Sequence, residues 1–228
     1  MKYKITIDGP AGAGKSTIAK ELAKDLNYFY IDTGAMYRSV TCASILYQIS
    51  CNDEEKLSGL ASKLKIKFSD NKAQYYIEDL YITPFIRSLA VNNFVSEVSV
   101  HKKVREELVK IQRRLAEDNP LDGTVMEGRD TGTVVLPDAN LKIYLTASLE
   151  ERVRRRVEQY EIQGFEVDSV KIKNDLAKRD KIDSSRSIAP LKKAKDAIVV
   201  DSTNLRIEEV LEKIKNLIKL WYKCYISS

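Results

Sequence analysis

The sequence is poor in the residues on which many active sites depend. It contains a single histidine, His101, and three cysteines, Cys42, Cys51 and Cys224. The cysteines are odd in number and no two of them have C-x-x-C spacing, so the sequence indicates neither a zinc site nor a disulfide framework. A histidine-centred triad and a histidine-rich metal centre are also disfavoured. His101 lies in a polar stretch, and we expect its side chain to face solvent.

Long hydrophobic runs are also lacking. None approaches the roughly 20 residues that a helix needs to cross a bilayer, and the first strand begins almost at once, which leaves no room for a signal peptide. We therefore expect a cytoplasmic protein with no membrane partner. The 228 residues, 43% hydrophobic and 31% charged, suffice for one α/β domain with a full core. A net charge of +5 suits either nucleic acid or an enzyme that holds several phosphates.

The most informative segment that is present fits the pattern Gly-x4-Gly-Lys-[Ser/Thr]. It comprises Gly9, Pro10, Ala11, Gly12, Ala13, Gly14, Lys15, Ser16 and Thr17. In this pattern backbone N–H groups wrap phosphate oxygens, the lysine reaches the β- and γ-phosphates, and the first hydroxyl binds Mg²⁺. A buried strand at residues 4–7 precedes the segment, and an amphipathic helix follows from Ser16, whose N-terminus attracts anions. A glycine-rich turn without a ligand is the alternative, but the setting predicts a nucleoside triphosphate site.

Short apolar, β-rich runs recur along the chain with helical segments between them. The runs are residues 5–7, 28–31, 124–126, 141–145 and 197–200. This alternation predicts a parallel sheet with helices on both faces, and ligands bind at the ends of such strands. A final helix with apolar residues at 3/4 spacing is predicted from Ile207 to Trp221.

Two regions interrupt the alternation. Within residues 57–100, two alternating runs at 64–68 and 74–77 predict a hairpin around a turn at 69–72. Residues 148–195 are dense in charge. There Ser148 and Glu151 form a capping box for a helix that ends near Gly164, and a second helix should run from Asp168 to about Ser184.

Four groups of polar residues accompany the phosphate loop. The segment 32–38 joins a strand end to a helix start and could hold a second phosphate, or it could be an ordinary cap with an exposed arginine. The segment 127–133 places an arginine beside a carboxylate between glycines, which suits a ligand or a structural turn with an internal ion pair.

The other two groups are helical. Ser96 and Arg105 lie around the start of a long helix, and by itself Arg105 is best interpreted as a surface arginine. The last group is spaced along two helices and comprises Arg152, Arg155, Arg156, Arg179, Asp183 and Arg186. Such arginines can neutralise a phosphoryl-transfer transition state, or they can form a solvated, salt-bridged face.

These segments occur together, and in order, in one family. They read Asp-Thr-Gly-Ala-Met-Tyr-Arg at 32–38, Ile-Arg-Ser at 86–88, Val-Ser-Glu-Val-Ser at 95–99, Val-Arg-Glu at 104–106, Gly-Arg-Asp-Thr-Gly-Thr-Val-Val at 128–135, Lys-Arg-Asp at 178–180, Asp-Ser-Ser-Arg-Ser-Ile-Ala-Pro-Leu at 183–191 and Val-Asp-Ser-Thr at 200–203. Over nearly its whole length the chain resembles the bacterial-type cytidylate kinases, a branch of the P-loop nucleoside monophosphate kinases.

The resemblance implies an α/β P-loop NTPase fold with three layers. A five-stranded parallel sheet flanked by helices would carry a small antiparallel β insertion that binds the nucleoside monophosphate, and a helical lid. The implied organisation is a single domain over residues 1–228. Its core covers about 1–56, 101–147 and 191–228, the insertion about 57–100 and the lid about 148–190.

The resemblance also implies a reaction, in which ATP with Mg²⁺ phosphorylates CMP or dCMP. The phosphate loop would hold ATP, with Ser16 on the metal. The residues implied for catalysis are Lys15, Arg129, Arg179 and Arg156. Those implied for the acceptor are Thr33, Arg38 and Arg129 at its phosphate, Ser96, Arg105 and Asp130 at the cytosine, and Asp183 with Arg186 at the ribose, with Tyr37 also in the CMP site. The arginines after Ser148 would belong to the lid.

The chain departs from the family pattern at three places. Glu127 stands where an aspartate is usual, Lys181-Ile182 replaces residues that are often charged, and the tail from Trp221 to Ser228 matches nothing. We expect ATP and CMP or dCMP as the only specific ligands, no specific nucleic acid, and a monomer.

The residue types agree with this chemistry. A phosphate monoester has a second pKa of about 6, so the acceptor is largely ionised and needs no general base. Cytosine offers an N4 donor that Asp130 can accept, whereas the 4-carbonyl of uracil would face it with lone pairs opposed. Two alternatives stay open: a P-loop kinase for AMP, UMP, dTMP or shikimate, and a nucleotide switch that binds RNA or a protein partner.

Overall fold

The fold is described by a computed structural model that covers residues 2–69, 72–162 and 164–226, with side chains to residue 221. The strands are β1 (Tyr3–Asp8), β2 (Phe29–Asp32), β3 (Leu64–Ser69), β4 (Lys72–Ile77), β5 (Leu80–Tyr81), β6 (Gly123–Gly128), β7 (Leu141–Thr146) and β8 (Ile198–Asp201). The helices are α1 (Lys15–Leu26), α2 (Thr33–Leu46), α3 (Glu54–Ser62), α4 (Leu89–Val98), α5 (Lys102–Asp118), α6 (Leu149–Ile162), α7 (Ser169–Ser185) and α8 (Ile207–Ile226), with a π-helical turn η1 (Thr131–Val135).

The chain forms two compact units. The first unit comprises the residues up to Ile31 and those from Ala116 onward, and the second unit spans Asp32–Leu115. Each is described below by itself.

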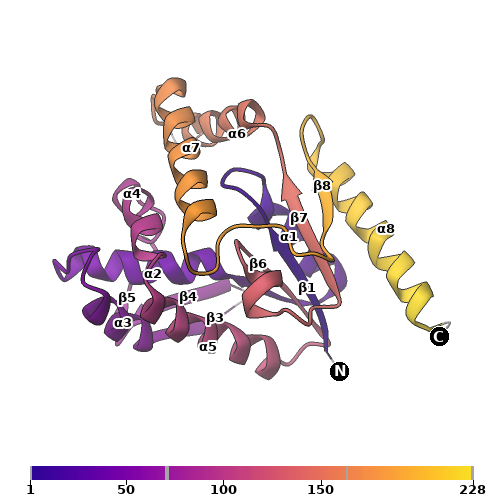
Figure 1. Cartoon of the computed structure of the whole chain (residues 1–228), viewed down its shortest axis with the longest axis horizontal. Coiled ribbons are helices and arrows are strands. Elements are labelled where there is room, and N and C mark those ends of the chain that lie inside the picture. The colour runs from indigo at the N-terminus through magenta and orange to yellow at the C-terminus, as the bar shows by residue number, and fades with distance from the viewer. Residues whose placement is uncertain (1, 70–71, 163, 227–228) are drawn as a thin grey trace. The chain divides into compact units, whose positions relative to one another are not determined.

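The first unit is built on a five-stranded parallel sheet in the order β2-β6-β1-β7-β8 (Figure 1). The central strand β1 pairs in parallel with β6 on one side and β7 on the other. All five strands lie where the apolar runs predicted them, so the α/β prediction is confirmed.

Helices α1 and α8 cover one face of this sheet. Ile18 and Leu22 of α1 and Ile214 of α8 pack with Ile5 and Ile7 of β1 in a single core. The 3/4 spacing of apolar residues had predicted both helices, because it places those residues on one side of each helix. Trp221 lies against the Tyr3 ring, with ring centroids 4.7 Å apart, so the beginning of the unassigned tail contributes to this core. Residues 227 and 228 lie outside the described part of the chain.

Helices α6 and α7 also belong to the first unit and pack against each other through apolar side chains, among them Val153, Ile172 and Leu176. The Ser148 hydroxyl accepts from the Glu151 N–H (3.2 Å), as a capping box requires. The reciprocal half of that prediction is wrong, because the Ser148 N–H donates to Thr203 and the Glu151 carboxylate binds arginines instead. Helix α7 follows Asp168, as predicted, and the Asp168 carboxylate caps it.

The second unit surrounds α2, which is buried along most of its length. Helices α3 and α4 and the antiparallel sheet β3-β4-β5 share its core, and the hairpin prediction is confirmed by the pairing of Leu64 with Ile77 through to Ser69 with Lys72. The two central residues of the predicted turn, 70 and 71, lie outside the described residues. The prediction for His101 is wrong: its ring is half-buried, with Nε2 2.6 Å from the carbonyl oxygen of Cys51.

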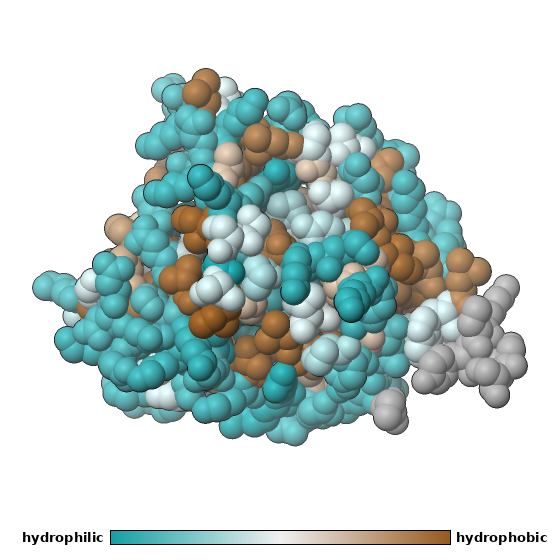
Figure 2. All heavy atoms as spheres, in the orientation of Figure 1, coloured by the Kyte–Doolittle hydropathy of each residue, from teal (hydrophilic) through white to brown (hydrophobic). Residues whose placement is uncertain are grey.

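Hydrophilic residues cover most of the face drawn in Figure 2. Within the described ranges, no helix combines the length and the apolar character needed to cross a membrane.

Candidate active site

The phosphate loop connects β1 to α1 at the carboxyl end of the sheet. Gly12 and Gly14 adopt positive φ values of 79° and 89°, which favour glycine. At Gly9 a Cβ would lie 1.9 Å from the carbonyl oxygen of Leu145, so the loop approaches β7 too closely for any side chain. Because the N-cap Gly14 has no side chain with which to cap α1, the N–H groups of the first turn can bind an anion instead.

Lys15 begins α1 and is buried, with its ammonium donating to the Pro10 carbonyl (2.8 Å). Burial disfavours the charged amine, and the positive Arg129 and Arg179 add to this effect. Together they lower the pKa of Lys15 to about 7 against the opposing charges of Glu127 and Asp8. An anion in the loop would reverse the balance, so Lys15 is poised to gain a proton when phosphate binds.

Ser16 and Glu127 lie together at the same end of the sheet. The Ser16 hydroxyl donates to Oε1 of the buried Glu127 over 2.6 Å. A hydroxyl and a carboxylate are the oxygen ligands that Mg²⁺ prefers, and the ion commonly takes one or two protein ligands with water and phosphate oxygens. The described residues contain no cluster of three or more acidic, histidine or cysteine side chains that could hold a metal without phosphate.

The segment after β6 is anchored to β1 by Asp8, a residue to which sequence reasoning gave no role. The buried Asp8 carboxylate accepts from the Thr131 N–H (2.9 Å), the Thr131 hydroxyl (2.8 Å) and the Gly132 N–H (2.8 Å). Burial raises the pKa of Asp8 even though these three bonds oppose the rise. The bonds hold the π-helical turn η1 on the sheet and thereby position Arg129 and Asp130, which directly precede it.

Arg129 and Arg179 converge on the buried carboxylate of Asp183. The Arg129 Nε lies 2.8 Å and the Arg179 Nε 4.0 Å from its Oδ2. Burial would raise the pKa of Asp183, but these arginines, with Arg186, hold it below its ordinary value. Asp183 therefore keeps its charge. It holds Arg129 by a hydrogen bond and attracts Arg179, two arginines that sequence reasoning assigned to the phosphates.

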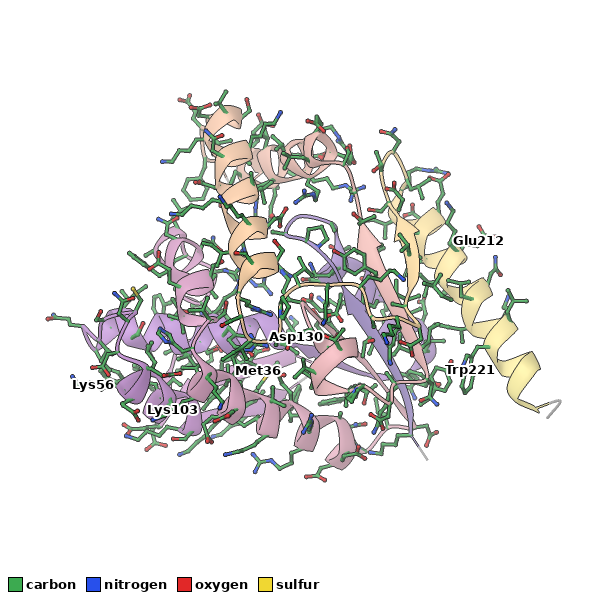
Figure 3. All side chains as sticks on the ribbon, viewed as in Figure 1. Met36, Lys56, Lys103, Asp130, Glu212 and Trp221 are labelled. Carbon is green, nitrogen blue, oxygen red and sulfur yellow. The ribbon has the colours of Figure 1, made fainter. Side chains whose placement is uncertain are left out.

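Asp130 (labelled in Figure 3) pairs with the last arginine of this group. The Arg186 guanidinium lies 3.5 Å from the Asp130 carboxylate and donates to the Ala189 carbonyl (2.7 Å). Each charged residue of the 129–130 pair thus finds its partner in the segment 183–186. The alternative of a turn with an internal ion pair is wrong, because both partners come from elsewhere in the first unit.

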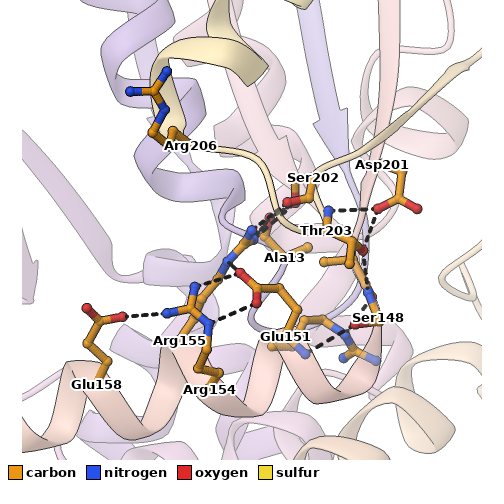
Figure 4. A network of polar contacts seen from close by, with 12 residues as sticks. Ala13, Ser148, Glu151, Arg154, Arg155, Glu158, Asp201, Ser202, Thr203 and Arg206 are labelled. Atoms are coloured by element: carbon orange, nitrogen blue, oxygen red, sulfur yellow. Dashed lines mark hydrogen bonds and ion pairs between the residues drawn. The ribbon is translucent and has the colours of Figure 1, made fainter.

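The arginines of α6 divide into two kinds (Figure 4). Arg154 lies on a solvated, salt-bridged face with Glu151 and Glu158. Arg155 instead donates to the Ser202 carbonyl (2.6 Å) and hydroxyl (3.0 Å), and to Glu151 (2.8 Å). Hydrogen bonding from Arg154 leads the causes that lower the pKa of the Glu151 carboxyl to about 2.

Arg156, which the resemblance placed among the catalytic residues, contacts its own helix. Its guanidinium lies over the Tyr160 ring, 5.5 Å from the centroid, and donates to Gln159. Arg152 contacts the phosphate loop, where it donates to the Ala11 carbonyl (2.9 Å).

The second unit holds the rest of the predicted acceptor residues. Thr33 is buried at the first turn of α2, where the Asp32 carboxylate caps the helix and binds Arg87 (2.7 Å). Arg38 is buried and donates to the side-chain oxygen of Asn92. The alternative of an exposed arginine at this position is therefore wrong. Sequence analysis gave Asn92 no role, and Arg87 entered it only as part of the family-like segment 86–88.

Tyr37, Ser96 and Arg105 gather in this unit. The Arg105 guanidinium lies 5.2 Å from the centre of the Tyr37 ring and donates to the Ser99 carbonyl (3.2 Å). The Ser99 hydroxyl in turn donates to the carbonyl of the buried Ser96 (2.9 Å). The interpretation of Arg105 as a surface residue is wrong. Although Arg105 lies beside the apolar stripe of α5 and not within it, its side chain is buried and its guanidinium lies over the Tyr37 ring.

The five-stranded parallel sheet flanked by helices, with the phosphate loop after its central strand, is the fold of the P-loop kinases. A gluconokinase of Sinorhizobium meliloti has this fold, with a TM-score of 0.51 at 14% identity over 99% of this chain and 97% of its own.

The pattern of the cytidylate kinase family matches residues 5–220. The cytidylate kinase of Halalkalibacterium halodurans is 47% identical over 96% of this chain and 98% of its own length, and that of a Geobacillus species is 47% identical over 94% and 96%. The chain belongs to the cytidylate kinase family.

Proposed function

We propose that this protein transfers the γ-phosphoryl group of ATP to CMP or dCMP, giving ADP and CDP or dCDP. The observation that carries the proposal is the phosphate loop with a buried Lys15 beside Arg129 and Arg179. Membership of the cytidylate kinase family supports the choice of acceptor.

Phosphoryl transfer between two anions requires in-line positioning and charge neutralisation more than proton transfer. The loop residues 9–17 hold the triphosphate, and Lys15 neutralises charge between the β- and γ-phosphates. Asp183 holds Arg129 by a hydrogen bond and has Arg179 within ion-pair distance before substrate arrives, so little reorganisation of Arg129 is needed during the reaction. The remaining catalytic assignment, Arg156, requires its side chain to leave Tyr160.

For the acceptor we propose three groups of contacts. Thr33, Arg38 and Arg129 hold the phosphate, Ser96, Arg105 and Asp130 read the cytosine, and Asp183 with Arg186 bind the ribose. Tyr37 also belongs to the CMP site. The Asp130 carboxylate can accept the N4 donor of cytosine, and this polarity disfavours uracil.

Mg²⁺ fits the oxygen pair of Ser16 and Glu127, where it would supply charge neutralisation for the triphosphate. Glu127 is longer than the aspartate usual in the family, and its bond to Ser16 places the longer carboxylate at the hydroxyl that would bind the metal. The segment 57–100 serves as the monophosphate-binding insertion and 148–190 as the lid of a monomeric, cytoplasmic enzyme.

The test is ADP release from Mg·ATP with CMP, dCMP, UMP or AMP as acceptor, beside a control without acceptor. We expect fast release with CMP and dCMP alone. Activity with UMP or AMP would leave phosphoryl transfer intact and contradict the base assignment. Release that is independent of acceptor would favour a nucleotide switch.

Asp130→Asn tests the base assignment directly. The amide can donate to the 4-carbonyl of uracil, so the ratio of kcat/KM for UMP to that for CMP should rise by about tenfold or more, within the range that a single polar pairing supplies. An unchanged ratio would remove Asp130 from base recognition.

A further inference from the structure

Asp180, on the face of α7 that meets the phosphate loop, is used by no step above. The apolar residues Ile172 and Leu176 pack on Ala11, and Asp180 follows one helical turn after Leu176 on the same face. Its Oδ1 accepts from the Ala11 N–H over 3.1 Å. A lid helix therefore contributes a carboxylate directly to the backbone of the phosphate loop.

Arg152 of α6 completes this contact. Its Nη1 lies 2.5 Å from Oδ2 of Asp180 and 2.9 Å from the carbonyl oxygen of Ala11, and its Nε donates to the Ala147 carbonyl (3.2 Å). The Arg152 side chain is buried, and α6 packs so closely that a Cβ on Gly12 would lie 3.1 Å from the Arg152 Cβ. The N–H and the C=O of Ala11 are thus both held by an ion pair between the two lid helices.

We propose that Asp180 and Arg152 are positioning residues, which hold the Ala11 peptide and keep the phosphate loop in the conformation that binds ATP. The inference rests on ATP binding at this loop, as proposed above. A loop that is already in its binding conformation loses less entropy on binding, so the pair acts on ATP affinity and not on the acceptor. Ala11 lies three residues before Gly14, so Asp180 leaves the first-turn N–H groups of α1 to the phosphates.

The charges explain why the two residues must act together. A carboxylate beside a phosphate-binding loop repels phosphate unless a cation neutralises it. Arg152 supplies that cation and is itself buried, so removing either partner leaves the other charge uncompensated. Loss of Arg152 should therefore harm ATP binding more than loss of both.

The experiment measures Mg·ATP binding calorimetrically without acceptor, together with KM for ATP and for CMP. For Asp180→Ala we expect Kd and KM for ATP to rise by about tenfold, the size of one lost charge-assisted hydrogen bond, with KM for CMP within about twofold. Asp180→Asn keeps the shape and an acceptor for the Ala11 N–H, so its loss should be smaller. Asp175→Asn, on an exposed residue of α7, is the matched control and should bind as the wild type.

A double-mutant cycle separates positioning from general destabilisation. Arg152→Gln should weaken ATP binding more than Asp180→Ala, and Arg152→Gln with Asp180→Asn should recover part of that loss. Additive losses, or equal rises in KM for ATP and CMP, would overturn the proposal. Tighter ATP binding by Asp180→Asn would also overturn it and show that the carboxylate blocks the loop.

Failure of the proposed function can be distinguished from failure of this inference. If the wild type binds ATP but does not phosphorylate CMP, the function is wrong, and the binding cycle still tests the pair.

Discussion

At the scale of single residues, the phosphate loop contains a lysine whose protonated form is disfavoured in the free protein. Lys15 is buried beside Arg129 and Arg179, with its pKa lowered to about 7. The negative charges of Glu127 and Asp8 do not outweigh burial and the two arginines, whereas a triphosphate would add enough negative charge to do so. Bound phosphate therefore raises the pKa of Lys15 and promotes the protonated form that binds it.

This arrangement predicts proton uptake when ATP binds. At pH 8 the free protein holds Lys15 largely deprotonated, and bound phosphates raise its pKa, so the complex should gain close to one proton. Uptake should diminish below pH 7, where Lys15 is already charged. Calorimetric titration with Mg·ATP in buffers of different ionisation enthalpy measures the number of protons taken up on binding. Lys15→Met should abolish it, whereas an enthalpy independent of buffer in the wild type would contradict the assignment.

At the scale of elements, η1 depends on how closely it approaches β1. Asp8 binds the N–H groups of Thr131 and Gly132, and this pulls Gly132 against the sheet. A Cβ on Gly132 would lie 2.8 Å from the Thr6 hydroxyl oxygen, which is fully buried. The segment that carries Arg129 and Asp130 therefore requires glycine because of its packing.

Two glycine-to-alanine substitutions should have opposite effects on stability. Gly132→Ala should lower stability by roughly 1–3 kcal/mol through overpacking. Gly59→Ala, in the exposed part of α3 where an added Cβ meets nothing within 4 Å, should raise it by about 0.5–1 kcal/mol. For a chain of this size, each 1 kcal/mol should shift the midpoint of thermal unfolding, Tm, by roughly 2–4 °C.

A second variant keeps the test of Gly132 specific. The Thr6 hydroxyl forms no hydrogen bond within the described residues, so Thr6→Ala removes the crowding at little cost. Thr6→Ala with Gly132→Ala should restore most of the lost stability. No restoration would mean that Gly132 is required for another reason.

At the scale of the whole molecule, the net charge of +5 favours anions without specifying which. Many of the arginines in the first unit are already paired, among them Arg129, Arg152 and Arg186. This pairing supports a site for one defined polyphosphate over an open basic surface for RNA.

Binding to single-stranded RNA should accordingly be weak and salt-dependent. We expect the affinity to fall steeply between 50 and 200 mM KCl, because it rests on counterion release. CMP phosphorylation at 200 mM KCl should be unchanged by added RNA. Binding that persists at 200 mM, or inhibition by RNA at that salt, would revive the nucleotide-switch alternative.

The predictions that succeeded rest on short-range patterns. The 3/4 spacing in α1 and α8, the alternation in β3 and β4 and the start of α7 after Asp168 each involve residues within a few positions of one another. The predictions that failed concern side-chain environment. His101 was expected to face solvent because its neighbours in the sequence are polar, and exposure was the alternative for Arg38 and Arg105 when each was taken by itself. All three are covered by residues from another element.

By itself the sequence determined the phosphate loop, the order of strands and helices, and the resemblance to cytidylate kinases, because backbone conformation and hydrophobic periodicity are set locally. Only the tertiary structure decided which charges meet. Asp8 reaches η1 across 123 positions and Asp180 reaches Ala11 across 169. Such pairs form because buried polar groups require partners, and the fold alone decides which partners are near.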